Sequence, residues 1–143
     1  MKTIIKICFI TASVLILISG VMHVLGIFFS DDLTPVNNDI KLLMENNPIK
    51  MHPDGMLWDL WVGFHAMFGM CLIFIGIIVI ILSTQGYYLL EKHSFISILI
   101  IIVIGFFVWI GRVYIIQPFV TAFAIPLGLL IIGFILILRK QHI

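Results

Sequence analysis

The chain has 143 residues, of which 62% are hydrophobic and only 10% are charged, and its formal net charge is +1. A soluble fold of this size has no means of burying so much apolar surface, so the composition indicates a membrane protein. Eight Lys and Arg against seven Asp and Glu provide no basic field, which excludes a typical nucleic-acid-binding protein.

Four apolar runs are each long enough to cross a bilayer as a helix. About 20 residues, rising about 1.5 Å each, span a hydrocarbon core roughly 30 Å thick. Such runs are helical in lipid even when rich in Ile and Val, because each must satisfy its own backbone hydrogen bonds. The predicted helices cover residues 7–29, 60–82, 95–116 and 119–138. We therefore predict an all-α integral membrane protein, an antiparallel four-helix bundle forming a single domain over residues 1–143.

Basic residues at the ends of the apolar runs indicate how the chain is oriented in the membrane. Five basic residues flank the four runs on one side: Lys2, Lys6, Lys92, Arg139 and Lys140. By the positive-inside rule both termini are cytoplasmic, and the expected location is the bacterial inner membrane, as a multi-pass protein. A cleaved signal peptide is the competing interpretation of residues 1–26. It is disfavoured because the run is long for an h-region and lacks an A-x-A-like end.

The connection over residues 30–59 is expected on the outer side, because it carries six acidic residues against two lysines. Thr34 and Pro35 predict the N-cap and first residue of a short helix that ends near Asn46-Asn47-Pro48. Ile40, Leu43 and Met44 would share one face of it. The sequence leaves open whether residues 34–47 form a lid over the bundle or a solvated connector.

A turn is predicted at His52-Pro53-Asp54-Gly55, before the second long helix. Asp54 would cap that helix, because a helix N-terminus favours negative charge.

Polar side chains within the apolar runs gather toward the outer end of each predicted helix. Counting inward from those ends places five of them within roughly 10 Å of the outer boundary: His23, His65, Arg112, Gln117 and Thr121. Trp58 and Trp61 would form an aromatic rim above them. We refer to these seven residues as the outer polar layer. The inner halves of the helices carry hydroxyls but no Asp, Glu, Lys, Arg or His.

Helical periodicity predicts that this layer faces protein. Gly20 and His23 share a stripe of the first helix, and His65 shares one with Gly69 and Gly76 on the second. On the third helix the expected inward stripe holds Gly105, Trp109 and Arg112. On the fourth it holds Gln117, Thr121, Ala124 and Gly128.

Four roles for the outer polar layer are compatible with the sequence. The first is structural, because histidines inside membranes often hydrogen-bond across helices for about 1 kcal/mol and Arg112 is close enough to the boundary to snorkel. The second is a pocket for a small anionic ligand or a lipid head group, which the planar fork of Arg112 would bind. The third is a haem held by His23 and His65. The fourth is an accessory subunit or homo-oligomer in a larger membrane complex.

Catalysis is disfavoured, because no carboxylate lies within the runs and Asp59 is on a different helix face from His65. The sequence therefore favours a non-enzymatic role without deciding it, and we assign no catalytic residue and, apart from the haem alternative at His23 and His65, no metal site. Its two cysteines, Cys8 and Cys71, form no C-x-x-C pattern. A proton-coupled exporter like the small multidrug transporters is also disfavoured, because the glutamate of their first helix has no counterpart here.

The segment Gly20-Val21-Met22-His23, together with Trp61-x-Gly63-Phe64 and Gly69, resembles a group of small uncharacterised bacterial four-helix membrane proteins. The resemblance covers the first two predicted helices and implies no activity.

Overall fold

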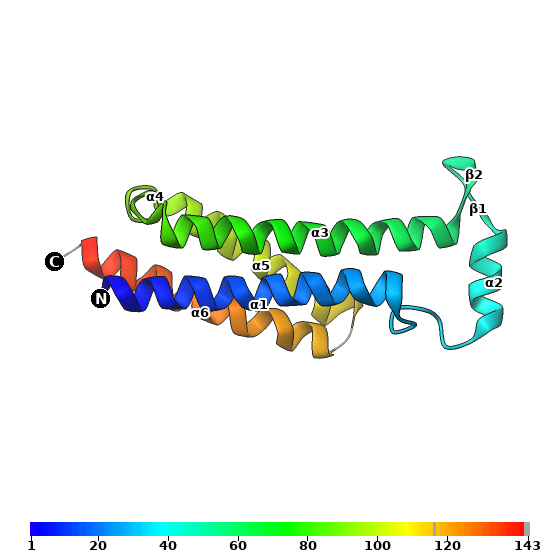
Figure 1. The fold of residues 1–143 in the computed structure, drawn as a ribbon, viewed down its shortest axis with the longest axis horizontal. Coiled ribbons are helices and arrows are strands. Elements are labelled where there is room, and N and C mark those ends of the chain that lie inside the picture. The colour runs from blue at the N-terminus through cyan, green and yellow to red at the C-terminus, as the bar shows by residue number, and fades with distance from the viewer. Residues whose placement is uncertain (116, 142–143) are drawn as a thin grey trace. The chain divides into compact units, whose positions relative to one another are not determined.

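The computed structural model describes residues 1–115 and 117–141 (Figure 1). Its elements follow in the order α1 (Lys2–Phe29), α2 (Asn38–Asn46), β1 (Pro48–Ile49), β2 (His52–Met56), α3 (Leu57–Thr84), α4 (Tyr87–Lys92), α5 (Ser94–Tyr114) and α6 (Gln117–Gln141). They form two compact units. Unit 1 comprises residues 1–18 and 73–143, and unit 2 comprises residues 19–72, so α1 and α3 each contribute to both.

The predicted all-α class is confirmed, since about 83% of the chain is helical. Within the described residues, the four predicted long helices correspond to α1, α3, α5 and α6, and two shorter helices, α2 and α4, accompany them. The long helices extend past most of the predicted ends because polar flanking residues can continue a helix beyond an apolar run. The predicted end of the third helix at residue 116 lies outside the described residues.

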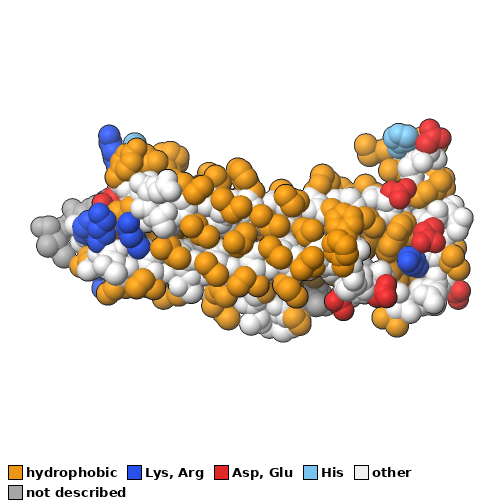
Figure 2. Space-filling model, in the orientation of Figure 1, with side chains coloured by type: hydrophobic (Ala, Val, Ile, Leu, Met, Phe, Trp, Pro, Cys, Tyr) orange, Lys and Arg blue, Asp and Glu red, His pale blue; other side chains and the backbone are white. Residues whose placement is uncertain are grey.

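The four long helices are apolar enough, by length and composition, to cross a membrane. Only 17% to 39% of the most apolar window in each is buried within the protein. Most of the remaining positions carry apolar side chains that are partly or fully exposed, and Figure 2 shows many hydrophobic side chains on the surface of the long helices. Composition therefore indicates a multi-pass membrane protein, in which lipid would cover this surface.

The core of unit 1 joins the first half of α1 to α6, and α6 to α5. A Cβ added at Gly133 of α6 would lie 2.7 Å from the Phe9 ring of α1. The Phe9 ring therefore packs in space that a side chain at position 133 would occupy. Gly111 of α5 similarly receives the ring of Phe119, 2.5 Å from the position of an added Cβ. Glycine thus sets the closest approach at both contacts.

Helix α4 lies between the second and third of the predicted long helices. Its Tyr87 side chain is buried, and its Glu91 carboxylate forms an ion pair with Lys140 of α6. Partial burial opposes ionisation of Glu91, but its interactions with Lys140 and Tyr87 hold the pKa of this carboxyl below its ordinary value. Burial and the nearby Glu91 carboxylate raise the pKa of Tyr87 above its ordinary range, so this side chain stays a neutral phenol.

Glu91→Gln should lower the free energy of unfolding by less than about 1 kcal/mol at pH 7, because the ion pair is partly exposed. A carboxyl whose folded pKa is lowered stabilises the protein above its unfolded pKa, and this stabilisation is lost as pH falls through the folded pKa. The difference between variant and wild type should therefore shrink as pH falls below the ordinary Glu value of 4.5 and vanish below the lowered folded pKa. Thermal unfolding in detergent between pH 7 and pH 3 measures it. A difference that persists unchanged at pH 3 would assign the effect to packing.

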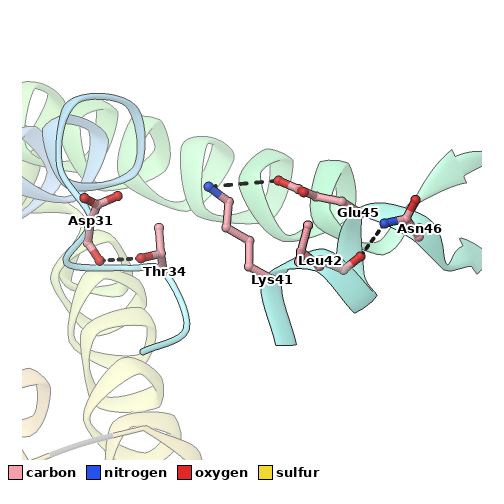
Figure 3. Close-up of polar contacts among 6 residues, drawn as sticks. All are labelled: Asp31, Thr34, Lys41, Leu42, Glu45 and Asn46. Carbon is pink, nitrogen blue, oxygen red and sulfur yellow. Dashed lines mark hydrogen bonds and ion pairs between the residues drawn. The ribbon is translucent and has the colours of Figure 1, made fainter. Parts of the chain in front are cut away.

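In unit 2, α2 begins at a different residue from the one predicted. The N-cap is Asn37, whose side chain accepts a hydrogen bond from the Asp39 backbone N–H at 2.9 Å. Thr34 instead closes a turn by donating to the Asp31 carbonyl at 2.7 Å (Figure 3). The predicted cap was wrong because Asn is at least as good a cap as Thr, and Asn37 is followed directly by the helical residues.

The predicted end of α2 is confirmed. Asn46 is the last helical residue, and its side-chain amide donates to the Leu42 carbonyl at 2.7 Å (Figure 3). Asn47 is the C-cap, and its amide donates to the Leu43 carbonyl. These amides satisfy carbonyls that a helix C-terminus leaves without a backbone partner.

The turn predicted at residues 52–55 is a strand. β2 pairs antiparallel with β1, placing Pro48 opposite Met56 and Ile49 opposite His52, and residues 50–51 form the turn. Pro and Gly are turn formers, but both are also tolerated in a short edge strand. Asp54 therefore lies in β2 and does not cap α3. The acidic residue in the first turn of α3 is Asp59, where the helix dipole favours it.

Candidate functional site

In unit 2, the C-terminal part of α1 contacts the N-terminal part of α3 where α3 carries a glycine. A Cβ added at Gly69 would lie 2.6 Å from Val24 Cγ2 and 3.2 Å from both the Val24 nitrogen and the Gly20 oxygen. Because backbone atoms occupy the space a side chain would need, only glycine permits this approach. The stripe predicted to face protein on each helix is therefore the contact face in unit 2.

Two histidines meet one turn away from this contact. His23 Nε2 of α1 and His65 Nδ1 of α3 are 2.8 Å apart, which is a hydrogen bond across the two helices. The rings stack with centroids 5.0 Å apart and planes 30° from parallel. One nitrogen donates and the other accepts, so a single proton lies between the two rings. Both side chains are partly buried.

Two aromatic side chains of α3 flank the histidine pair. The Trp61 ring lies 4.3 Å from the His65 ring, and the Phe68 ring meets the His23 ring edge-on at 5.0 Å. Trp61 belongs to the predicted outer polar layer, whereas Phe68 does not. Phe68 follows His65 by three residues and therefore lies on the same side of the helix, which is the sequence feature that could have predicted its contact with the histidine pair.

Trp61 also fixes the chain that follows α1. Its indole Nε1–H donates to the Leu33 carbonyl at 2.9 Å, and the Leu33 side chain lies against Gly26 of α1. The Lys41 ammonium of α2 lies 5.0 Å from the centre of the Trp58 ring, a cation–π contact. The two tryptophans predicted as a rim therefore hold the segment between α1 and α3 against the start of α3.

Trp61→Phe should release this segment while leaving α3 intact. The phenyl ring keeps most of the contact with His65 but loses the N–H donor, at a cost of about 1 kcal/mol. Amide hydrogen exchange should become at least threefold faster over residues 30–37 and stay unchanged in the inner half of α3. Trp109→Phe is the matched control, because Trp109 is 53% exposed. Unchanged exchange over residues 30–37 in Trp61→Phe would contradict this role.

The other three members of the outer polar layer belong to unit 1. Arg112 is in the last turn of α5, where a cation is favoured by the helix dipole. Gln117 begins α6, and its carbonyl accepts a hydrogen bond from the Thr121 hydroxyl at 3.2 Å. All three side chains are exposed. A shared layer joining them to the histidine pair combines residues of both units and stays a prediction.

The inward stripes predicted for α5 and α6 are wrong. The buried positions of α5 are Ser97, Ile104 and Gly111, while Trp109 and Arg112 are exposed. On α6 the buried face runs through Val120, Phe123, Pro126, Leu130, Gly133 and Ile137. An added Cβ at Gly105 or Gly128 would meet nothing within 4 Å in the described chain. On these uniformly apolar helices a glycine does not by itself identify the packed side, because Gly111 and Gly133 meet neighbouring rings whereas Gly105 and Gly128 do not.

The histidine pair does not fit an iron between its rings in this arrangement. Two metal–nitrogen bonds of about 2.0–2.1 Å on opposite sides of an ion would separate the nitrogens by about 4 Å, whereas they lie 2.8 Å apart. Among residues 1–115 and 117–141, no three His, Cys, Asp or Glu side chains are grouped to hold a metal ion. Cys8 and Cys71 are free thiols. The arrangement supports hydrogen bonding between helices.

Comparison of the chain with protein-family models, curated proteins and solved structures gave no significant match. The resemblance of its first two long helices to small bacterial four-helix membrane proteins therefore stays a prediction.

Proposed function

We propose that the chain is a four-span protein of the bacterial inner membrane, with both termini in the cytoplasm and the spans arranged as an antiparallel bundle. The distribution of charge supports this orientation. Unit 1 carries six Lys or Arg against one Glu, and unit 2 carries six Asp or Glu against two Lys. In unit 1 the basic side chains other than Arg112, which is in the last turn of α5, gather at the end that carries α4, and in unit 2 the acidic ones gather around α2 and the hairpin (Figure 2). Basic loops remain cytoplasmic.

Cysteine labelling in intact cells tests this orientation. In a Cys8→Ala, Cys71→Ala background, a membrane-impermeant maleimide should modify Asn38→Cys in α2 and should leave Tyr88→Cys in α4 unmodified until the cells are opened. Labelling of Tyr88→Cys in intact cells would overturn the proposed orientation.

The role proposed for the histidine pair is structural and non-enzymatic: it locks the outer halves of the first two spanning helices together beneath the external segment. The 2.8 Å hydrogen bond between His23 and His65 carries this proposal. In an apolar environment an unpaired imidazole is costly, so each ring supplies the partner that the other requires. His23→Phe and His65→Phe should lower stability measured by thermal unfolding, without loss of any bound molecule.

The competing role is a small-ligand or head-group pocket in the outer polar layer, and the same assay separates the two. If a metabolite pool or lipid extract raises the melting temperature of the wild type but not of Arg112→Ala, the ligand-binding role replaces the structural one. Equal responses in both proteins support the structural role.

A second candidate function is that of an accessory subunit, which the exposed apolar side chains of α2 favour. Ile40, Leu42 and Leu43 are 49%, 54% and 61% exposed. A photo-reactive residue at Leu43 should give one protein adduct of constant mass in native membranes, and the same residue at Asn38 should give much less. Adducts with lipid alone would place α2 on the bilayer surface and remove this candidate.

A further inference from the structure

The end of unit 1 that carries α4 concentrates positive charge around one aromatic ring. The ammonium groups of Lys2, Lys6 and Lys140 lie 5.1, 5.4 and 5.8 Å from the centre of the buried Tyr87 ring. Two of these lysines come from the start of α1 and one from the end of α6. Three like charges around one ring repel one another, so the arrangement favours an anion nearby.

The protein supplies little negative charge to balance this cluster. Glu91 is the only acidic residue in unit 1, and its carboxylate is paired with Lys140. Lys6 donates to the Thr84 carbonyl at 3.1 Å, which is a neutral acceptor. Lys92 and Arg139 add two further exposed cations at the same end. The cluster therefore keeps a large positive excess after its internal ion pair is counted.

An open hollow lies beside the cluster. Its volume is about 370 Å³, and it is lined by Tyr88, Glu91, Lys92 and Lys140. Lys92 and Lys140 thus border the hollow from α4 and α6. A group that enters it meets two ammonium donors and one aromatic side chain that is 64% exposed.

We propose that this hollow binds the phosphate of an acidic phospholipid from the cytoplasmic leaflet. Ammonium groups form charge-assisted hydrogen bonds with phosphate oxygens, and basic residues next to membrane spans attract anionic lipids. Apolar side chains that acyl chains could cover lie near the starts of α1 and α5, where Ile4, Ile7 and Phe95 are 56%, 57% and 64% exposed. The choice of a lipid over free phosphate rests on this apolar surface and on the membrane location proposed above.

Binding is tested on the full-length protein in a neutral detergent. Lysophosphatidylglycerol should raise the melting temperature in a saturable manner, while lysophosphatidylcholine and inorganic phosphate at equal concentrations should not. In Lys92→Gln/Lys140→Gln the apparent Kd for lysophosphatidylglycerol should rise on the order of tenfold. The matched control is Lys41→Gln/Lys50→Gln, which removes two lysines of unit 2 and should bind as the wild type does. Lys92→Gln alone should weaken binding about threefold, and it leaves the Glu91–Lys140 ion pair in place.

Glu91→Gln provides a test of opposite sign. It removes the only acidic side chain that lines the hollow and releases Lys140, so it should tighten binding of the acidic lipid about threefold, even though it weakens the fold slightly. Three outcomes would overturn the proposal: equal stabilisation by lysophosphatidylcholine, equal stabilisation by inorganic phosphate, or weaker binding of lysophosphatidylglycerol in Glu91→Gln. Because these measurements do not depend on orientation in a cell, a failed maleimide experiment would remain distinguishable from a failed lipid site.

Discussion

Replacing Gly76 with alanine is expected to lower the free energy of unfolding by about 2 kcal/mol. The added Cβ would lie 2.9 Å from Leu17 Cβ, 3.0 Å from the Ser13 carbonyl oxygen and 3.1 Å from Leu17 Cα. These are atoms of or next to the α1 backbone, so the contact is relieved only if the helices separate. Overpacking of this kind costs about 1–3 kcal/mol, which exceeds the gain of up to about 1 kcal/mol in helix propensity from Gly to Ala.

Gly63 provides the matched control on the same helix. An added Cβ there meets nothing within 4 Å in the described chain, so Gly63→Ala should be neutral or slightly stabilising. Gly69→Ala should be destabilising like Gly76→Ala, because it meets Val24 and Gly20. Steric trapping or mixed-micelle unfolding measures all three variants. If Gly76→Ala proved as stable as Gly63→Ala, the close contact of α1 with α3 would be contradicted.

Removing either histidine of the pair is expected to lower the free energy of unfolding by about 1.5 kcal/mol. Hydrogen bonds between membrane helices average about 0.6 kcal/mol and reach about 1.7 kcal/mol. Loss of one ring also leaves a polar nitrogen on the other without its partner. Phenylalanine preserves the ring contacts with Trp61 and Phe68 and removes the hydrogen bond. His23→Phe and His65→Phe therefore measure the contribution of the hydrogen bond to the free energy of unfolding.

The double variant decides whether the two rings act together. If His23 and His65 are each other's partners, the combined loss in His23→Phe/His65→Phe should be smaller than the sum of the single losses by about 1 kcal/mol. Strictly additive losses would mean that each histidine acts through different neighbours. His52→Phe in the hairpin is the control, because that side chain is exposed and should change stability by less than about 0.5 kcal/mol.

The long helices could be predicted from sequence because their length and apolarity are set by the bilayer. The packed faces of α1 and α3 could also be predicted, since Gly69 and Gly76 mark a face on which α1 comes close. The same reasoning failed for α5, where Gly105 lies in open space and Gly111 receives the Phe119 ring. A glycine is informative only when a second helix happens to pass it, and an apolar helix gives no contrast between faces to indicate where that occurs.

The segment between α1 and α3 shows a different limit of prediction from sequence. The end of α2 was predictable because Asn46, Asn47 and the following proline leave few alternatives. Its start was not, because Thr34 and Asn37 are both competent caps and the choice depends on which one closes the preceding turn. The hydrogen bond from Trp61 to the Leu33 carbonyl could not be predicted from the sequence. Every residue has a backbone carbonyl, so the residue type does not indicate which one accepts.

For the candidate site, matching depth along two antiparallel helices placed His23 and His65 at the same level. Their direct hydrogen bond depends in addition on helix rotation and separation, which the sequence specifies only through Gly20 and Gly69. Residues of the outer polar layer on α5 and α6 had no comparable marker, and their participation stays a prediction.

The hydrogen bond between His23 and His65 places one proton between α1 and α3. The most direct measurement is the through-hydrogen-bond ¹⁵N–¹⁵N coupling in protein labelled with ¹⁵N-histidine and reconstituted in lipid. We expect a correlation between Nε2 of one ring and Nδ1 of another that disappears in both His23→Phe and His65→Phe. Full stability of both variants together with no such correlation in the wild type would contradict the proposed lock.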